Sequence, residues 1–196
     1  MTDLSATAAD ILQCARKLVI AGGYNGFSYA DIAAEIGIRK ASIHYHFPSK
    51  VDLMRTLVER YREDALSGLA EMERLHPDPV KLLRAYTGFW AACIGNMTMP
   101  FCACALLASE MPLLPPEVAL EVKAYFRALS AWLTAVLERG AKQNELFLSG
   151  SARAEAEAFL ATLHGAMLSA RAYEDPAIFA AITEPLIKRL AAPRRK

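Results

Sequence analysis

The sequence is poor in residues that interrupt helices, and it lacks any segment suited to a sheet or a membrane span. Only ten of its 196 residues are glycine and ten are proline. No stretch alternates apolar and polar residues over the length of a strand, and no apolar run approaches the ~20 uncharged residues that cross a bilayer. We therefore expect an all-α protein of about nine helices, with enough hydrophobic residues (54%) to fill a sizeable core.

A strong charge of either sign and an N-terminal targeting signal are also missing. The formal net charge is +1. Such a balance is not that of a protein that coats nucleic acid non-specifically, so any specific contact with DNA requires basic side chains to gather on one face. The first ten residues contain acidic side chains and no basic segment followed by an apolar one. This pattern predicts a cytoplasmic protein that does not associate with a membrane.

The four cysteines, Cys14, Cys93, Cys102 and Cys104, do not have the spacing of a zinc site. In the cytoplasm they are expected to be reduced and mostly buried. The sequence has no glycine-rich phosphate loop, no HExxH segment and no nucleophile elbow, so we predict no enzyme, no metal and no cofactor. The Cys-x-Cys pair leaves one alternative open, in which a thiol senses redox state or electrophiles.

Residues 27–50 form the most informative segment of the chain. Ser28 is followed three residues later by Asp31, the spacing of a capping box at the start of a helix. Gly37 stands where a helix commonly ends in a left-handed residue. Apolar anchors for the second helix follow at helical intervals, namely Ile38, Ile43 and Phe47. The pattern predicts a helix-turn-helix over about residues 29–48.

The second helix of this motif carries hydrogen-bonding side chains between its apolar anchors. These can reach phosphates or base edges in a major groove. The candidates are Arg39, Lys40, Ser42, His44, Tyr45 and His46, with Lys50 at the start of the next helix. The alternative is a polar, solvated helix whose histidines pack incidentally. The agreement of capping, turn glycine and anchors favours DNA binding.

The segment from Phe27 to Leu53 resembles the DNA-binding head of the TetR/AcrR family of transcriptional repressors. That head reads Phe-Thr, a variable pair, Ile-Ala, Gly-Val, a polar pair, Gly-Thr-Leu-Tyr, an aromatic or histidine segment, and a helix that starts with lysine. The matching positions here are Phe27, Ser28, Ile32, Ala33, Gly37, Ile38, Arg39, Lys40, Ala41, Ser42, Ile43, His44, Tyr45, His46, Phe47 and Lys50.

The resemblance implies a set of DNA contacts and two departures from the family pattern. The implied contacts are Ser28, Tyr29, Lys40, Ala41, Ser42, His44, Tyr45, His46 and Lys50. Ala41 replaces the usual Gly or Pro, and His44 stands where Tyr is common. A histidine is shorter than a tyrosine and lacks its hydroxyl, so the family pattern indicates the binding mode but not the operator sequence.

The rest of the chain divides into helices at its proline-rich and glycine-containing breaks. We expect helices over residues 5–21, 50–75, 80–97, 103–111, 117–141, 152–173 and 176–191. The break at residues 76–79 suggests a DNA-binding domain over 1–50 and a connecting helix over 51–76. The resemblance implies a ligand-binding and dimerisation domain over 77–196.

A stripe of small residues in the segment 152–173 suggests a close helix–helix contact between two copies of the chain. Its members and their expected partners on the last helix are Ala154, Ala158, Ala161, Gly165, Ser169, Ile182 and Leu186. Leu160, Leu163 and Met167 occupy a neighbouring stripe that can face the chain's own core. The alternative is that both stripes are buried within one chain. Two-fold half-sites on DNA favour the dimer.

Aromatic and flexible side chains on the central helices suggest a pocket for a broad, largely apolar effector. The candidate lining residues are Tyr86, Phe89, Trp90, Cys93, Met97, Phe101, Tyr125, Leu129, Trp132 and His164. Further polar anchors could come from Arg171, Glu110 and Asn96. The alternative for each of these residues is an ordinary place in the core or on the surface.

Together these features predict a homodimeric, ligand-inducible repressor that binds a pseudo-palindromic operator. Its two heads would enter successive major grooves. One alternative is a repressor that responds through Cys102 or Cys104, and another is an architectural DNA-binding protein without an effector.

Overall fold

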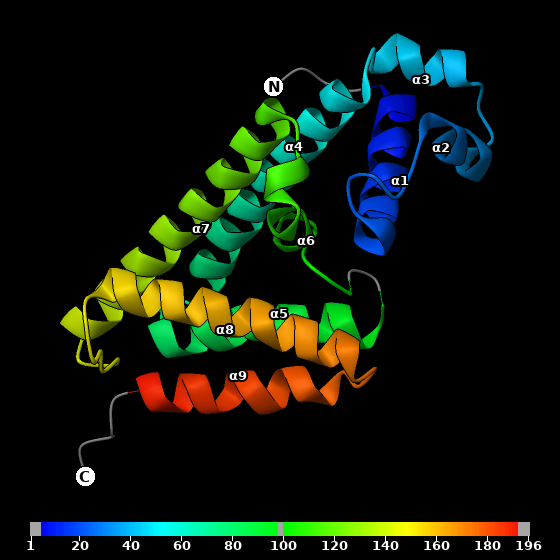
Figure 1. Cartoon of the computed structure of the whole chain (residues 1–196). Coiled ribbons are helices and arrows are strands. Elements are labelled where there is room, and N and C mark those ends of the chain that lie inside the picture. Colours follow the sequence, from blue (N-terminus) through cyan, green and yellow to red (C-terminus); the bar gives the residue numbers. More distant parts are fainter. Residues whose placement is uncertain (1–4, 98–99, 192–196) are drawn as a thin grey trace. The chain divides into compact units, whose positions relative to one another are not determined.

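The computed structural model describes residues 5–97 and 100–191, and over these ranges the chain forms nine α-helices and one short 3-10 helix, η1 (Figure 1). The helices are α1 (Ala6–Gly22), α2 (Tyr29–Ile36), α3 (Lys40–His46), α4 (Lys50–Leu75), α5 (Pro79–Gly95), α6 (Ala103–Ser109), η1 (Met111–Leu113), α7 (Pro116–Lys142), α8 (Ala152–Ala172) and α9 (Ala177–Leu190). Within the same ranges, β pairing is limited to one isolated bridge between Leu146 and Ala191. The all-α prediction is confirmed.

The observed helix ends follow from local chemistry at each end. Helix α5 begins at Pro79 because Asp78 caps it: the Asp78 side chain accepts a hydrogen bond from the backbone N–H of Lys81 at 2.9 Å. Proline suits the first position of a helix, where its missing N–H is not needed. The helix expected over 103–111 ends instead at Ser109 and gives way to η1, which contains Pro112. The other ends lie close to those predicted.

The chain folds into two compact units, and each unit draws on two separate segments. One unit consists of residues 1–63 and 103–125, and the other of residues 64–102 and 126–196, as far as these are described. Helices α4 and α7 each contribute residues to both units. The sequence placed its boundaries after residues 50 and 76. These boundaries of the DNA-binding, connecting and ligand-binding segments remain predictions. The compact units are instead divided after residues 63, 102 and 125.

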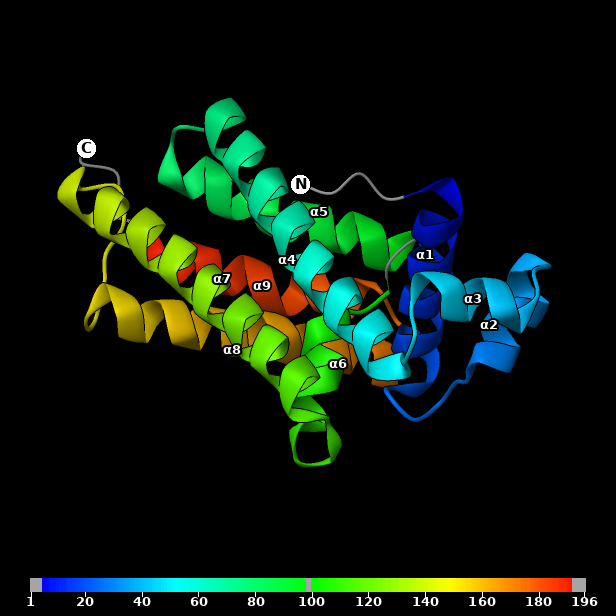
Figure 2. The ribbon, with the colours of Figure 1, turned by 90° about the horizontal axis from the view of Figure 1, so that it is seen from above.

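The first unit has its core where α1 packs against α2, α3 and α6. One apolar side of α1 is buried, with Ile11, Ala15 and Val19 fully inaccessible. Buried side chains from the other elements complete this core, namely Ile32, Ile43, Leu53, Met54, Leu107 and Val118. Helices α1, α2 and α3 lie together in both views of the chain (Figures 1 and 2).

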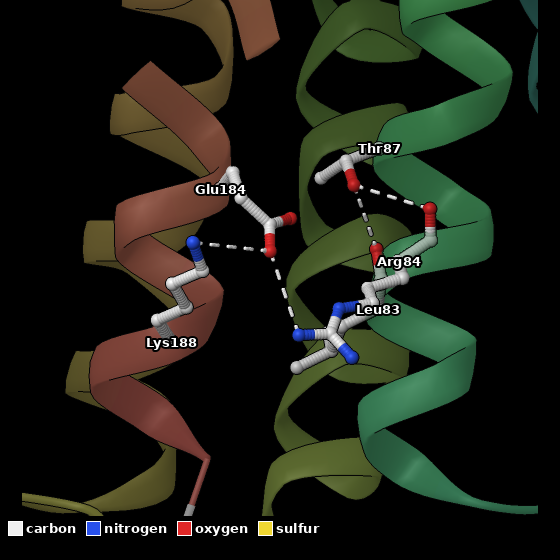
Figure 3. A network of polar contacts seen from close by, with 5 residues as sticks. All are labelled: Leu83, Arg84, Thr87, Glu184 and Lys188. Carbon is white, nitrogen blue, oxygen red and sulfur yellow. Dashed lines mark hydrogen bonds and ion pairs between the residues drawn. The ribbon is translucent and has the colours of Figure 1, made fainter. Parts of the chain in front are cut away.

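In the second unit α9 lies beside both α8 and α5. The core side chains include Leu82, Leu83, Leu133, Leu137, Phe159, Leu163, Met167, Phe179 and Ile187. A surface network joins α5 to α9, as Figure 3 shows: Glu184 accepts from Arg84 at 3.5 Å and lies 3.9 Å from the ammonium of Lys188. On α5, the Thr87 hydroxyl bonds to backbone carbonyls one turn earlier.

Candidate nucleic-acid interface

Helix α2 is fixed at both ends by the residues that the sequence singled out. The backbone N–H of Ser28 donates to Asp31 Oδ2 at 2.7 Å, and the Ser28 hydroxyl oxygen accepts from the N–H of Ala30 at 3.2 Å. The Ser28 hydroxyl also donates to Asp31 Oδ2 at 2.8 Å, and this bond, together with that from the Ser28 N–H, lowers the pKa of the Asp31 carboxyl group. Gly37 ends the helix in a left-handed conformation (φ 72°, ψ 32°). That conformation costs glycine little and sets the angle at which α3 follows.

Tyr29 holds the C-terminal end of α3 from inside the motif. Its hydroxyl group donates to the carbonyl oxygen of Phe47 at 2.8 Å, and its ring meets the ring of His44 edge to face at 4.8 Å. Burial, together with the charges of Asp52 and Tyr24, raises the pKa of Tyr29 to about 12. The resemblance had assigned this residue a DNA contact, but its side chain is 9% exposed and is engaged in packing.

The outward face of α3 presents most of the polar side chains that the sequence predicted for DNA. Arg39, Lys40, Ala41, His44 and Tyr45 are exposed, whereas Ser42 and His46 are half-buried. The ring of Tyr45 is 83% exposed and lies edge to face with that of His46. The Ile43 side chain is fully buried on the opposite face. The short helix therefore has one anchored side and one side free to contact a ligand.

His44, one of the two departures from the family pattern, is oriented by a backbone carbonyl. Its Nδ1 lies 3.2 Å from the carbonyl oxygen of Pro48. A carbonyl oxygen can only accept a hydrogen bond, so Nδ1 must carry the proton in this arrangement. The ring is therefore held in one tautomer, with Nε2 left for other contacts.

Lys50 ties the start of α4 to the connection between α1 and α2. Its ammonium group donates to the carbonyl oxygen of Phe27 and lies over two aromatic rings, 4.1 Å from the centroid of Phe27 and 5.0 Å from that of Tyr24. Burial lowers the pKa of Lys50, and the negative charges of Asp31 and Glu110 oppose that shift. The sequence suggested Lys50 only as a phosphate contact. The structure gives it this internal role, with further ammonium protons left to donate.

The residues predicted to line a pocket are mostly buried, but they are not all in one place. Tyr86, Trp90, Cys93, Phe101 and Leu129 are buried in the second unit, and Trp132 and His164 are half-buried there. Tyr125 is buried as part of the first unit, where its ring lies 5.5 Å from that of Tyr61. Phe89 and Met97 are exposed. Of the other suggested anchors, Glu110 belongs to the first unit.

Tyr86, Trp132 and His164 have the best-defined environments among these candidates. The rings of Tyr86 and Trp132 lie 5.2 Å apart, and the Trp132 indole N–H donates to Glu73 at 3.3 Å. His164 packs edge to face on Phe126, and its Nε2 is buried without a hydrogen-bond partner. Burial lowers the pKa of His164 to about 4. The imidazole is therefore neutral near pH 7.

The predicted dimer contacts divide into an exposed and a buried set. Ala154, Ala158, Ala161 and Gly165 are exposed along α8, and Ser169 and Ile182 are half-buried. Leu186 is already buried within the single chain. The neighbouring stripe of Leu160, Leu163 and Met167 is buried, as predicted. The exposed small residues leave one side of α8 open to close approach by another helix.

All four cysteines are free and buried. Cys102 and Cys104 have no exposed surface, and burial raises the pKa of Cys14. A reactive cysteine needs both an accessible sulfur and a stabilised thiolate. In this conformation the sulfur atoms of Cys102 and Cys104 are not accessible.

A capped helix, a left-handed glycine turn and a short second helix with an exposed polar face together define a helix-turn-helix DNA-binding regulator. Residues 11–57 match a family model described as bacterial regulatory proteins, tetR family. The whole chain is similar to a TetR-family transcriptional regulator from Agrobacterium tumefaciens, with 61% identity, 95% of this chain and 98% of the other covered, and a TM-score of 0.94. The chain belongs to the TetR family of transcriptional regulators, which are not enzymes.

Two other solved structures share this fold over almost their full length. A TetR transcriptional regulator from Legionella pneumophila is 26% identical, with 96% and 100% coverage and a TM-score of 0.85. A regulatory protein TetR from Rhodobacter sphaeroides is 19% identical, with 95% and 100% coverage and a TM-score of 0.86. No curated protein matches the chain. Among the described helices, none has both the length and the apolar character needed to cross a membrane.

Proposed function

We propose that this regulator is a ligand-inducible repressor that binds a pseudo-palindromic operator as a homodimer in the cytoplasm. The observation that carries the proposal is the exposed polar face of α3, which Ile43, Tyr29 and Gly37 hold against the rest of the motif. A rigid helix of this kind can enter a major groove and read base edges without first becoming ordered.

The proposed DNA contacts fall into two groups by position. The first group is proposed to enter the major groove from α3 and from the residue just before it. Its members are Arg39, Lys40, Ala41, Ser42, His44, Tyr45 and His46. Ser28 lies at the N-terminus of α2, where the positive end of the helix dipole favours a phosphate. Tyr29 and Lys50 are proposed to act indirectly. Tyr29 holds the end of α3, and Lys50 holds the start of α4 to the connection between α1 and α2.

The homodimer is supported by the exposed side of α8. Small side chains allow two helices to approach closely, and Leu168 is exposed on the same helix. A two-fold dimer would present two copies of α3 to half-sites one turn of DNA apart, about 34–36 Å. Analytical ultracentrifugation tests this part, and a species with the mass of one chain at micromolar concentration would contradict it.

The proposed effector is a small and largely apolar molecule that binds in the second unit. Tyr86, Trp90 and Trp132 supply aromatic surface there, and neutral His164 supplies a nitrogen without a partner. A ligand that binds one conformer better than the other shifts the population between DNA-binding and released states. The burial of Cys102 and Cys104 does not favour the thiol-sensing alternative.

Selection of duplexes from a random-sequence pool tests DNA recognition directly. We expect an enriched, pseudo-palindromic sequence, and we expect Tyr45→Ala to lose about tenfold or more in preference for it. Tyr173→Ala, which removes a 72% exposed tyrosine from the second unit, is the matched control and should bind as the wild type does. If no sequence is enriched at low ionic strength, the proposed function is wrong.

A screen of small apolar compounds by thermal shift separates an inducible repressor from an architectural DNA-binding protein. A compound that raises the melting temperature of the free protein and also releases the selected duplex is expected. If no compound in a chemically diverse set does both, the architectural alternative is favoured.

A further inference from the structure

Glu110 lies far from the helix-turn-helix segment in sequence but bonds directly to the connection that leads into it. Its Oε2 accepts a hydrogen bond from the backbone N–H of Tyr24 at 2.7 Å, across 86 positions of the chain. Glu110 follows α6 and belongs to the same compact unit as α1, α2 and α3. A bond from an amide to a carboxylate is stronger than a neutral one, so this contact is a substantial restraint on the connection.

Gly23 provides the space that this contact needs. Its φ is +75°, in a region that L side chains rarely adopt, and a Cβ atom there would lie 1.9 Å from Glu110 Oε1. Any other residue at position 23 would therefore push the carboxylate away from the N–H of Tyr24. The backbone conformation and the acidic side chain are matched to each other.

The restrained connection carries the elements that position α2 and α4. The rings of Tyr24 and Phe27 lie under the ammonium of Lys50, which also donates to the carbonyl oxygen of Phe27. The next residue, Ser28, caps α2. Glu110 also acts on Lys50 through its charge. A shift of Tyr24 would therefore disturb the start of α2 and the start of α4 together.

We propose that Glu110 is a positioning residue for DNA binding, which holds the connection between α1 and α2 so that the recognition helix α3 is presented in its binding geometry. This inference rests on the proposed function. It assigns a role in DNA binding to a residue well outside the segment 11–57 that matches the family model.

The direction of the change in DNA affinity distinguishes a positioning role of Glu110 from a simple effect of its charge. DNA is a polyanion, so removing a negative charge from the protein should by itself tighten binding or leave it unchanged. We expect Glu110→Ala to weaken binding to the selected duplex about tenfold, because Tyr24 N–H loses a charged acceptor. The slope of log affinity against log salt should stay the same, since no phosphate contact is removed.

The control is Glu138→Ala, which removes the same charge from an exposed position on α7 in the second unit. It should bind within about twofold of the wild type. Glu110→Gln keeps an oxygen that can accept from Tyr24 and should retain most of the affinity. Glu110→Asp keeps the charge but withdraws the oxygen by one methylene, so it should bind less tightly than Glu110→Gln. The reverse order would overturn the proposal without depending on whether Glu110→Ala folds.

Amide hydrogen exchange in the DNA-free protein tests the bond itself. Protection of the Tyr24 amide should be present in the wild type and in Glu110→Gln, and lost in Glu110→Ala, with the core amides of α1 unchanged. If Glu110→Ala binds the duplex as tightly as the wild type does, the positioning role is rejected but the proposed function is not. A wild-type protein that binds no duplex would reject the proposed function, and the inference with it.

Discussion

The two compact units differ in how far along the chain their charged side chains bond to the backbone. In the first unit, besides ion pairs such as Arg62–Glu121, two charged side chains bond to the backbone of distant residues: Glu110 accepts from the N–H of Tyr24, 86 positions away, and Lys50 donates to the carbonyl oxygen of Phe27, 23 positions away. In the second unit, Asp78, Glu155 and Asp175 accept from backbone N–H groups at most six positions away, and the contacts of charged groups across longer stretches of the chain include the side-chain pairs Arg139–Glu73 and Arg84–Glu184.

Bonds to the backbone fix where a chain segment lies, whereas pairs of exposed side chains constrain it little. The first unit must hold a seven-residue helix, α3, in one orientation, and such a short helix is not stable by itself. The second unit obtains its stability from apolar packing between long helices. The long-range bonds to the backbone therefore position segments of the first unit, whereas the exposed side-chain pairs of the second unit contribute little to its geometry.

The largest effect should come from the apolar core of the second unit. Phe159 is fully buried on α8, and Phe159→Ala removes its contacts and leaves a cavity. We expect the free energy of unfolding to fall by about 3–5 kcal/mol. Urea denaturation followed by circular dichroism measures the loss. A decrease under 1 kcal/mol would show that packing at this helix is not what stabilises the unit.

A second large effect concerns pH and again involves the second unit. Burial lowers the pKa of His164 to about 4, below the ordinary value of about 6.5. The unfolded chain then binds a proton more readily than the folded chain, so stability is fully present above about pH 6.5 and falls as the pH decreases toward 4. The difference corresponds to about 3 kcal/mol as an order of magnitude. In His164→Gln this part of the pH dependence should disappear.

Urea denaturation at pH 7, 6, 5 and 4 checks the prediction for His164. Both proteins should also lose stability through their carboxylates at low pH, so the quantity that matters is the difference between them. A constant difference across this range would contradict a buried neutral imidazole.

In the first unit, removal of one hydroxyl should reduce both stability and DNA binding. Tyr29→Phe keeps the ring but leaves the carbonyl oxygen of Phe47 without its donor. We expect a loss of about 1–2 kcal/mol in stability and several-fold weaker binding to the selected duplex. Tyr173→Phe is the control at an exposed position. Unchanged binding by Tyr29→Phe, measured by fluorescence anisotropy, would remove Tyr29 from the residues that hold α3.

The smallest effect should come from the network on the surface of the second unit (Figure 3). Arg84 and Glu184 are each about half exposed and 3.5 Å apart. Arg84→Ala should change the urea midpoint by an amount equivalent to less than about 0.5 kcal/mol and leave DNA binding as it is. A loss above 1 kcal/mol would mean that side-chain pairs in this unit do constrain its helices, and the contrast between the units would then be smaller than we infer.

The sequence predicted the elements that depend on neighbouring residues. The Ser28–Asp31 capping box, the left-handed Gly37 and the bounds of α4 all involve residues within one or two turns of each other, and all are present. The Ser49–Asp52 pair, which has the same spacing, bonds in the same way. The family pattern, too, is confined to one short segment, and the family model and the 61% identical structure confirm the assignment.

The contacts that the sequence did not reveal join residues far apart in the chain. Nothing near Glu110 indicates that its carboxylate meets Tyr24, and nothing near Tyr29 indicates that its hydroxyl turns inward to Phe47. An aromatic stripe cannot by itself show which ring faces outward, so exposed Phe89 and buried Trp90 looked alike. One feature of the sequence hints at a long-range contact, namely the pair Gly22–Gly23. Gly23 lies where the Glu110 carboxylate approaches the backbone closely.

The discontinuity of the first unit bears on how the protein is made. Residues 103–125 complete the unit that holds α1, α2 and α3, and they leave the ribosome only after residues 64–102. During synthesis, the face of α1 that α6 covers therefore stays exposed to solvent until α6 has been made. A truncated chain that ends after α4 would keep that face exposed permanently, and it is a poor substitute for the whole protein in any binding assay.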